Sequence, residues 1–336
     1  MKVKAVSAIR EIHQATPDDL TQELLAANQP VVFRGLVKHW PLVQKSLQSD
    51  QSIVDYLRGF SNQQPVQSFS SDAINNGRYF YNAQLDGFNF APKTSTLEGV
   101  IEDVLLHCTD NSAPTTYLGS TALEHILPGV RQQNPLAPLE HAPLVSLWLG
   151  NQSRIAAHYD IPDNLACTVA GRRRFTLFPP DQIDNLYVGP IDFTPAGQSA
   201  SLVDFQQPDF QRFPKFKLAL EQAQVAELEP GDAIFIPSMW WHHVESLAKF
   251  NLLVNYWWRQ VPNYLGSPMD ALNHALLSIR DLPESQRHIW RDIFEHYVFS
   301  AREQAHIPEL QQGVLKPLDE AAARRLRATL INKLNR

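Results

Sequence analysis

The stretch AAHYDIPDN, residues 156–164, places His158 and Asp160 two positions apart, directly after an apolar run. The apolar run predicts a buried strand, and side chains two apart along a strand point to the same face. The two side chains are therefore placed to bind one metal ion together. With 12 histidines and 20 aspartates in 336 residues, however, about 0.7 such pairs arise by chance. Alone, the pair is weak support for a metal site, and an ordinary half-exposed polar pair is the alternative.

A second stretch, EPGDAIFIPSMWWHHVESL at residues 229–247, follows a short apolar strand with the adjacent histidines His242 and His243. A non-haem Fe(II) site of the facial type needs two imidazoles and one carboxylate on one side of the metal, with the other positions open. His158, Asp160 and one later histidine supply that set if two distant strands face each other. Neighbouring residues on a strand point to opposite faces, so only one of the two histidines is a candidate ligand.

Two alternatives remain open on the residue types alone. Adjacent histidines beside Trp240 and Trp241 also serve as packing residues whose ring nitrogens meet backbone carbonyls. Two histidines and one aspartate also suit zinc, and ligand type does not exclude manganese or nickel. The pattern therefore indicates a metal site without fixing the metal.

The segment from about residue 115 to 260 must position these side chains, and it consists of short apolar runs separated by Pro, Gly, Asp and Asn. Many short strands with turn residues between them predict a sandwich or barrel. The runs are not separated by helical crossovers, which disfavours a doubly wound parallel sheet. Helical spacing occurs in residues 94–108 and again after Pro262. The sequence predicts a mainly β core with flanking helices over residues 1–262 and a helical segment over residues 263–336.

The composition excludes several classes of protein. With 44% hydrophobic and 19% charged residues, the chain is a globular protein and not a disordered one. The charged start lacks the apolar core that a signal peptide has, and no apolar stretch is long enough to span a membrane. Cys108 and Cys167 are too few for a disulfide scaffold, so a reducing, cytoplasmic setting is expected. The net charge of −6 weakly disfavours a nucleic-acid partner.

Four motifs, HYDIPDN, GRRRFTLFPPDQIDNLY, PGDAIFIPSMWWHHVESL and NLLVNYWW, resemble the cupin-type JmjC oxygenases, which use Fe(II) and 2-oxoglutarate. The pattern is most similar to the branches that hydroxylate asparagine in the hypoxia-inducible factor and wybutosine in tRNA. Similar segments outside these motifs extend the resemblance over nearly the whole chain. It implies a double-stranded β-helix, or jelly roll, with Fe(II) bound by His158, Asp160 and His242. It also implies a reaction that uses O2 to couple the oxidative decarboxylation of 2-oxoglutarate to hydroxylation of a substrate C–H bond.

The resemblance further implies where 2-oxoglutarate binds. The family usually places a lysine fifteen positions beyond the first histidine to hold the distal carboxylate, and this chain has Arg173 there. Arginine offers a carboxylate a bidentate fork in place of a point charge, and strand alternation predicts Arg173 inward with Arg172 and Arg174 outward. Ile155 departs from the family because relatives carry a threonine there, and isoleucine donates no hydrogen bond. The other implied contacts are Tyr117, Asn164, Asn255 and Trp257.

These features lead to one main hypothesis and two alternatives for the function. The main one is an Fe(II)/2-oxoglutarate-dependent dioxygenase that hydroxylates a protein or peptide side chain. The insert that grips peptide in the asparaginyl hydroxylases carries Ser199 and Ala200 here, so that specificity is not carried over. One alternative is the same chemistry on a tRNA nucleoside, and the other is a cupin that binds a metal or ligand without turnover.

The helical tail is expected to have a function of its own. In the resembling hydroxylases the C-terminal helices form a homodimer, so a two-fold, self-complementary interface is expected here. A helical cap packed on the barrel is the alternative. The apolar positions at helical spacing that support either role are Leu272, Leu276, Ile279, Ile289, Ile293, Tyr297 and Leu330.

Overall fold

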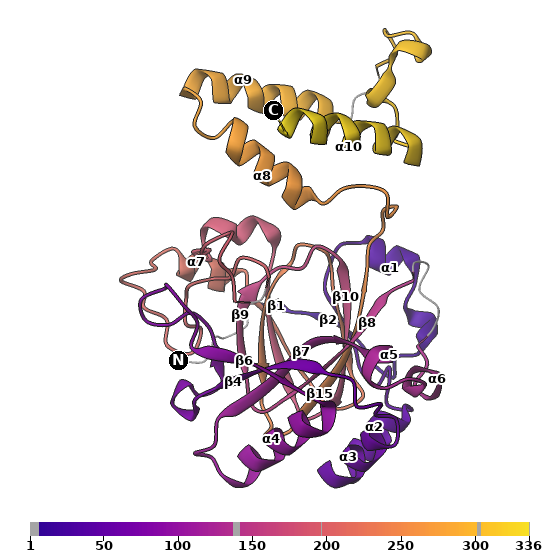
Figure 1. The fold of residues 1–336 in the computed structure, drawn as a ribbon, viewed down its shortest axis with the longest axis vertical. Coiled ribbons are helices and arrows are strands. Elements are labelled where there is room, and N and C mark those ends of the chain that lie inside the picture. Colours follow the sequence, from indigo (N-terminus) through magenta and orange to yellow (C-terminus); the bar gives the residue numbers. More distant parts are fainter. Residues whose placement is uncertain (1–6, 137–141, 196, 301–303, 336) are drawn as a thin grey trace. The chain divides into compact units, whose positions relative to one another are not determined.

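The structure is a computed structural model, and it describes residues 7–136, 142–195, 197–300 and 304–335. The chain divides into two compact units, Met1–Gln260 and Val261–Arg336. The first unit holds all the strands that the structure describes and the second is helical, as Figure 1 shows.

Two β-sheets form the centre of the first unit, and from β8 onward the chain passes repeatedly from one sheet to the other. The larger sheet has the order β2-β3-β13-β10-β15-β8-β7-β4-β6 and the smaller one β1-β12-β11-β14-β9-β5. The strands of the larger sheet are β2 (Arg10–Ile12), β3 (Val31–Phe33), β4 (Val66–Ser71), β6 (Phe90–Ser95), β7 (Thr115–Ala122), β8 (Leu144–Gly150), β10 (Asp163–Ala170), β13 (Ala233–Ile236) and β15 (Asn251–Trp258). Those of the smaller sheet are β1 (Ser7–Ala8), β5 (Arg78–Tyr79), β9 (Arg154–His158), β11 (Arg173–Phe178), β12 (Gln224–Leu228) and β14 (Trp241–Ser246).

Burial explains why strand β10 reads as an almost continuous apolar run. It lies between β13 and β15, antiparallel to both, and Ala166 is opposite Ile234 on one side and Asn255 on the other. Every residue of β10 is buried. Both faces of this strand are covered, so its sequence does not alternate between apolar and polar residues. The strand also places the segment after the His-x-Asp turn in the middle of the larger sheet.

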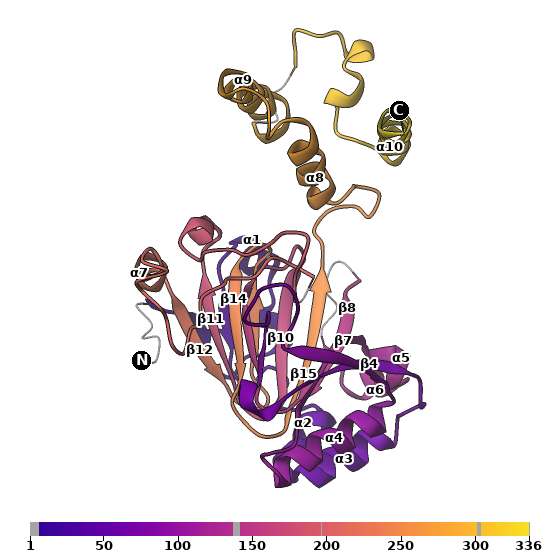
Figure 2. The ribbon, with the colours of Figure 1, turned by 60° about the vertical axis from the view of Figure 1, so that its left-hand side comes forward.

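Helices cover the outside of the sheets, and the expected mainly β core with flanking helices is confirmed. α2, α3 and α4 lie together at one end of the unit in Figures 1 and 2. Their apolar side chains join the larger sheet in one core cluster that includes Trp40, Ile53 and Val104. The helices of this unit are α1 (Gln22–Ala26), α2 (Pro41–Gln48), α3 (Asp50–Arg58), α4 (Leu97–Thr109), α5 (Leu123–Ile126), α6 (Val130–Gln133) and α7 (Phe216–Glu221).

Two further apolar clusters fix the smaller sheet. Between the sheets, Phe175 and Leu177 of β11 pack with Ile234 and Leu253 of the larger sheet. On the outer face, Phe178 and Trp241 pack with the insert that precedes β12, including Phe205 and Phe216. The smaller sheet is therefore held from both sides, and its strands β9, β11 and β14 are rigid supports for a site between the sheets.

The described residues of the second unit form three α-helices, α8 (Pro268–Ser278), α9 (Glu284–Phe294) and α10 (Glu320–Leu334), together with a π-helical turn and two 3-10 turns. Among its described residues, Ala323 of α10 is the only helical residue that is buried. No helix in the described part of the chain is long and apolar enough to cross a lipid bilayer.

Candidate metal centre

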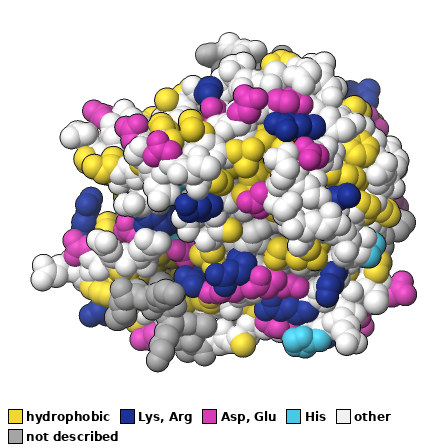
Figure 3. Space-filling view, turned by 90° about the horizontal axis from the view of Figure 1, so that it is seen from below, with side chains coloured by type: hydrophobic (Ala, Val, Ile, Leu, Met, Phe, Trp, Pro, Cys, Tyr) yellow, Lys and Arg dark blue, Asp and Glu magenta, His cyan; other side chains and the backbone are white. Residues whose placement is uncertain are grey.

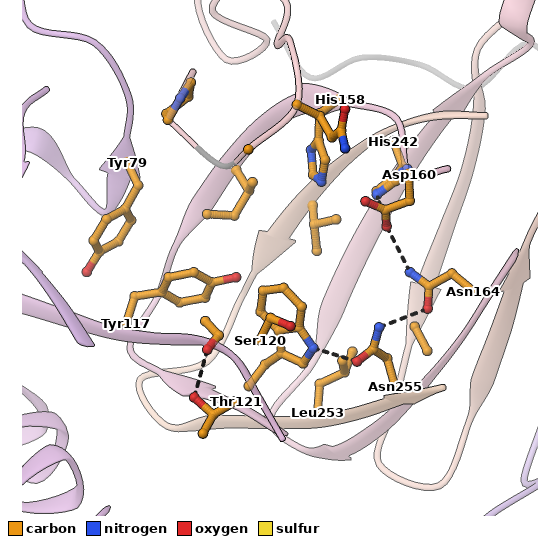
Figure 4. A pocket seen from close by; sticks show the side chains of 18 of the residues that line it. Tyr79, Tyr117, Ser120, Thr121, His158, Asp160, Asn164, His242, Leu253 and Asn255 are labelled. Atoms are coloured by element: carbon orange, nitrogen blue, oxygen red, sulfur yellow. Dashed lines mark hydrogen bonds and ion pairs between the residues drawn. The ribbon is translucent and has the colours of Figure 1, made fainter. Parts of the chain in front are cut away.

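Strands β9 and β14 bring three of the predicted site residues together. His158 is the last residue of β9, Asp160 lies in the turn that follows, and His242 is the second residue of β14. His242 lies directly opposite His158 in the antiparallel pair, with the ring centroids 4.3 Å apart. The possible ligand atoms of these three side chains all lie within 4.8 Å of one another. Figure 4 shows the three side chains side by side at the cavity wall.

Hydrogen bonds orient the three side chains toward a common point. His158 Nδ1 lies 2.9 Å from the carbonyl oxygen of Ala156, and His242 Nδ1 lies 2.9 Å from that of Trp240. Each Nδ1–H therefore donates to the backbone, which leaves each Nε2 lone pair free for a metal. The Nε2 atom of His242 is 3.5 Å from Asp160 Oδ2. This arrangement of two imidazole nitrogens and one carboxylate suits a divalent transition metal.

The electrostatics of the cluster favour the protonation states that a metal needs at two of the three side chains, His158 and Asp160. Burial, together with the neighbouring His242, lowers the pKa of His158 to about 4. Burial also acts to lower the pKa of His242, but the hydrogen bond and charge of Asp160 outweigh it and raise that pKa. Burial acts to raise the pKa of Asp160, but the hydrogen bond and charge of His242, the charge of His158 and the hydrogen bond from Trp257 together outweigh it and lower that pKa. His158 is therefore neutral and Asp160 anionic at neutral pH, as metal ligands must be.

His243 lies on the opposite face of β14 from the cluster. Its ring packs on Phe205 with the centroids 4.6 Å apart, on the outer side of the smaller sheet. The side chain is buried, and burial lowers its pKa to about 4. The structure thus separates the two adjacent histidines as strand alternation predicts, with His242 on the side of Asp160 and His243 on the side of the apolar insert.

A cavity of about 900 Å³ extends from the cluster between the two sheets. All five side chains that the sequence proposes as cosubstrate or pocket contacts line it, namely Tyr117, Asn164, Arg173, Asn255 and Trp257. Ile155, the residue that departs from the family, also lines it and presents an apolar surface. The structure therefore gathers the whole predicted set in one space, from strands β7, β9, β10, β11, β14 and β15 and the turn after β9.

A chain of hydrogen bonds supports Asp160 from behind. Asn164 Nδ2 donates to Asp160 Oδ2 over 3.4 Å, and Asn255 Nδ2 donates to Asn164 Oδ1 over 3.2 Å. Trp148 Nε1 then donates to Asn255 Oδ1 over 2.8 Å, and Trp257 Nε1 donates to Asp160 Oδ2 over 3.2 Å. Figure 4 shows the asparagines in this line beside Asp160. The two asparagines therefore orient the Asp160 carboxylate. A network of buried polar groups holds its members rigidly when every member is hydrogen-bonded.

Trp148 belongs to this series of hydrogen bonds but was not predicted from the sequence. It lies in β8, whose LVSLWLG run places Ser146 and Trp148 on the same face. Both residues lie against the strand that carries Asn255, since Asn255 pairs with Ser146. A polar and an aromatic residue two positions apart, Ser146 and Trp148, in an otherwise apolar strand were the sequence feature that could have indicated this contact.

Arg173 is a buried cation without an anionic partner among the residues that the structure describes. It is the first residue of β11 and is only 4% exposed, and its Nε atom has no hydrogen-bond partner among the described residues. Burial lowers its pKa to about 10, so the guanidinium stays protonated at neutral pH, with Tyr117 as the neighbour that favours its charge. Its neighbours point outward: Arg172 is exposed, and Arg174 pairs with Glu227 and Glu245. A buried charge is stable only when paired, so this position fits an anionic ligand.

A turn at residues 237–240 fastens the loop that carries Asp160. The backbone N–H of Met239 donates to the carbonyl oxygen of Asp160 over 2.9 Å. Asp163, which is buried, accepts from the backbone N–H of Ser238 over 2.9 Å and from Gln260 Nε2 over 2.6 Å. Asp163 thus ties the His158–Asp160 segment to the turn before His242, a contact between residues 75 apart that the sequence analysis did not identify.

Replacing Asp163 with alanine is expected to loosen this connection. The change leaves the Ser238 N–H and the Gln260 amide without their acceptor and should lower the free energy of unfolding by about 1–3 kcal/mol. It should also weaken Mn(II) binding by about tenfold, because the partners that orient metal ligands affect affinity on that scale. Thermal unfolding and water-proton relaxation measure the two effects. The exposed Asp184→Ala variant is the control, and unchanged Mn(II) affinity in Asp163→Ala would contradict the positioning role.

Comparison with known proteins places this fold and site in a family. Residues 17–264, well over half of the chain, match the family described as cupin-like domain. This chain belongs to the cupin-like domain family. The resemblance and the double-stranded β-helix expected from the motifs are thereby confirmed.

Several known proteins are similar in sequence to parts of this chain. Lysine-specific demethylase JMJ31 of Arabidopsis thaliana is 32% identical over 134 residues, which are 40% of this chain and 24% of that protein. tRNA wybutosine-synthesizing protein 5 of Gallus gallus is 31% identical over 145 residues, 39% of this chain and 42% of that protein. Lysine-specific demethylase 8 of Xenopus tropicalis is 24% identical over 260 residues, 75% of this chain and 53% of that protein. The chain therefore spans about half or less of the length of these relatives.

Proposed function

We propose that this protein is an Fe(II)- and 2-oxoglutarate-dependent dioxygenase that hydroxylates a side chain of a protein or peptide. The observation that carries the proposal is the buried guanidinium of Arg173, which has no ion-pair partner among the described residues and lies in the same cavity as His158, Asp160 and His242. A metal site alone fits many proteins. A metal site together with a buried cation that needs an anion fits a cosubstrate that has two carboxylates.

Each part of the site has a defined role in this proposal. His158, Asp160 and His242 would hold Fe(II), and Arg173 would hold the distal carboxylate of 2-oxoglutarate, with Tyr117 beside it. When bound, the metal and cosubstrate supply the oxidising chemistry that inserts one oxygen atom of O2 into a substrate C–H bond and cleaves 2-oxoglutarate to succinate and CO2. Asn164 and Trp257 hold the Asp160 carboxylate in place, and the apolar surface of Ile155 excludes water from the cosubstrate pocket.

An anaerobic titration tests the cofactor part of the proposal. Adding Fe(II) and 2-oxoglutarate to the apo protein under nitrogen should produce the weak visible charge-transfer band of a chelated 2-oxoacid. Arg173→Ala is the matched variant, which should need a higher 2-oxoglutarate concentration for the same band. Metal binding without the band would favour the alternative of a cupin that binds metal or ligand without turnover. Preferential binding of zinc, with no affinity for Fe(II), would contradict the proposed metal.

A tRNA nucleoside is the alternative substrate for the same chemistry. Its support is the similarity to proteins named tRNA wybutosine-synthesizing protein 5. Against it stand the net charge of −6 and the surface in Figure 3, where Lys and Arg are interspersed with Asp and Glu. Binding of nucleic acid depends on neutralising phosphates and falls steeply with salt. A tRNA affinity in the micromolar range or tighter that falls with salt would favour the alternative.

We propose that residues 263–336 form a homodimer interface. The helices of this segment leave large apolar side chains exposed, among them Leu277 at 77%, Ile289 at 59% and Phe299 at 72%. Exposed apolar faces of this kind are typical of subunit contacts. Sedimentation velocity should give a dimer for the wild-type chain and a monomer for Ile289→Glu. An exposed polar residue on the same helix, Gln286→Glu, is the control, and a wild-type monomer at micromolar concentration would contradict the interface.

The two cysteines support a reducing setting such as the cytoplasm. Cys108 and Cys167 are both free thiols, and Cys167 is fully buried in β10. Burial raises the pKa of both thiols, so neither is an activated nucleophile. We therefore propose a cytoplasmic location.

A further inference from the structure

The charges of the cavity are all accounted for by the proposed function. Apart from the two histidines of the metal cluster, the described residues that line it include two ionisable side chains that are charged at neutral pH, Asp160 and Arg173. Burial raises the pKa of Tyr79 and Tyr117, so both phenols are neutral. Asp160 belongs to the metal cluster, and Arg173 faces the expected cosubstrate carboxylate. No described carboxylate of the cavity is left to accept an ammonium or guanidinium group of a substrate.

The rest of the cavity offers an aromatic wall, which we define as Phe69, Tyr79, Phe90 and Tyr117. Tyr79 contacts Tyr117 and Phe90 with ring centroids 5.3 and 5.7 Å apart, and Phe69 contacts Phe90 at 5.4 Å. The Tyr79 hydroxyl donates to Thr115 Oγ1 over 3.1 Å, so its polar end is already bonded. Figure 4 shows Tyr79 and Tyr117 on the side of the cavity away from Asp160.

The way two strands separate explains why this wall is open to the cavity. β4 pairs with β7 from Ser68 to Ser71 and not beyond, and Val66 and Gln67 pair only with β6. β7 meanwhile continues along β8, with a register shift between Leu118 and Thr121. The residues on both sides of this separation, Val66 and Gln67 on one and residues 119–122 on the other, line the cavity. Gln67 is exposed and shares a face of β4 with Phe69.

From these observations we infer that the site takes an uncharged side chain with apolar surface, and not the cationic side chain of lysine or arginine. The inference rests on the proposed function and names the substrate class of that same site. A cationic side chain that enters this cavity loses its hydration. The one carboxylate among the described lining residues, Asp160, already belongs to the metal cluster and does not compensate that loss. An apolar group gains by leaving water for the aromatic wall.

A pair of probes of equal length tests the inference: hexan-1-ol, which is neutral, and hexylammonium, which is cationic. The full chain is loaded with Mn(II) and 2-oxoglutarate, and the paramagnetic broadening of each probe's NMR signals is followed with concentration. Hexan-1-ol should half-saturate at a concentration at least tenfold below that of hexylammonium. Equal or tighter binding of hexylammonium would overturn the inference and indicate a cation over the ring faces. Binding of neither probe would also overturn it, because the wall would then not be accessible.

A variant that adds one carboxylate sharpens the test. Gln67→Glu puts a negative charge beside Phe69 at the cavity rim, and it should strengthen hexylammonium binding by up to about fivefold. Hexan-1-ol binding should stay within a factor of two of the wild-type value. Gln64→Glu is the matched control because Gln64 is exposed and lies outside the cavity lining. An unchanged affinity of Gln67→Glu for hexylammonium would contradict the placement of the probe at the aromatic wall.

Failure of the inference is distinguishable from failure of the proposed function. Water-proton relaxation reports Mn(II) binding directly, and a signal that Asp160→Ala does not reduce would show that the metal site itself is wrong. Saturation-transfer NMR with the metal-free chain still compares the two probes in that case. Mn(II) bound at Asp160 together with preference for hexylammonium would overturn only the substrate class.

Discussion

Replacing His242 with alanine is expected to abolish metal-dependent turnover, whereas the same change at the adjacent His243 leaves turnover largely intact. His242 Nε2 is directed at the cluster because its Nδ1 is bonded to the Trp240 carbonyl oxygen. Its loss removes one of the three proposed ligands and should weaken Mn(II) or Fe(II) binding by at least about 100-fold, more than the loss of a supporting contact. Succinate formed from 2-oxoglutarate in air, with Fe(II) and ascorbate, measures the effect without a known substrate.

His243 provides a matched control because it differs from His242 only in the face of β14 on which it lies. Its ring packs on Phe205 in the outer apolar cluster, so His243→Ala should lower the free energy of unfolding by about 1–3 kcal/mol. Its Mn(II) affinity should stay within about twofold of wild type. Asp160→Ala should behave like His242→Ala and remain folded. If His243→Ala lost metal binding as His242→Ala does, the assignment of the ligand would be wrong.

The fold was predictable from the sequence because its strands are short, apolar and separated by turn residues. Strand β10, for example, follows from the run LACTVA, and α4 begins after Thr96, whose side chain caps the Gly99 N–H within the expected segment 94–108. The metal cluster was predictable for a similar reason. Strand alternation puts His158 and Asp160 near one face and separates His242 from His243, and the register of β9 with β14 completes the set.

The supporting contacts were not predictable because they join residues that are distant in sequence. Asn164 and Asn255 were expected to contact the cosubstrate, but the structure also bonds them to each other and, through Asn164, to Asp160. Asp163 fastens the metal loop through Ser238, and neither residue has a distinctive pattern around it. The aromatic wall likewise requires the separation of β4 from β7, which depends on strand register. One-dimensional periodicity contains no information on such pairings.

The Arg173→Met variant is expected to raise the 2-oxoglutarate concentration needed for half-maximal turnover by about 100-fold, since a charged hydrogen-bonded partner of a buried carboxylate is worth about 2–5 kcal/mol. Methionine keeps most of the side-chain volume and removes the charge. Without cosubstrate, this variant should unfold at a higher temperature than wild type, because a buried guanidinium with an unpaired Nε destabilises the fold. Steady-state kinetics and thermal unfolding measure the two effects.

Affinity for 2-oxoglutarate is thus expected to fall while thermal stability rises, a combination that a merely structural arginine would not produce. A residue that only supports the barrel loses stability when it is truncated, with or without ligand. If Arg173 instead serves to bind an anion, 2-oxoglutarate should stabilise the wild-type protein strongly by mass action. It should not stabilise the Arg173→Met variant. Arg173→Lys should fall between the two, because lysine restores the charge and not the bidentate fork. If Arg173→Met kept the wild-type 2-oxoglutarate requirement, another residue would hold that carboxylate, and the cavity would contain a buried charge without a function.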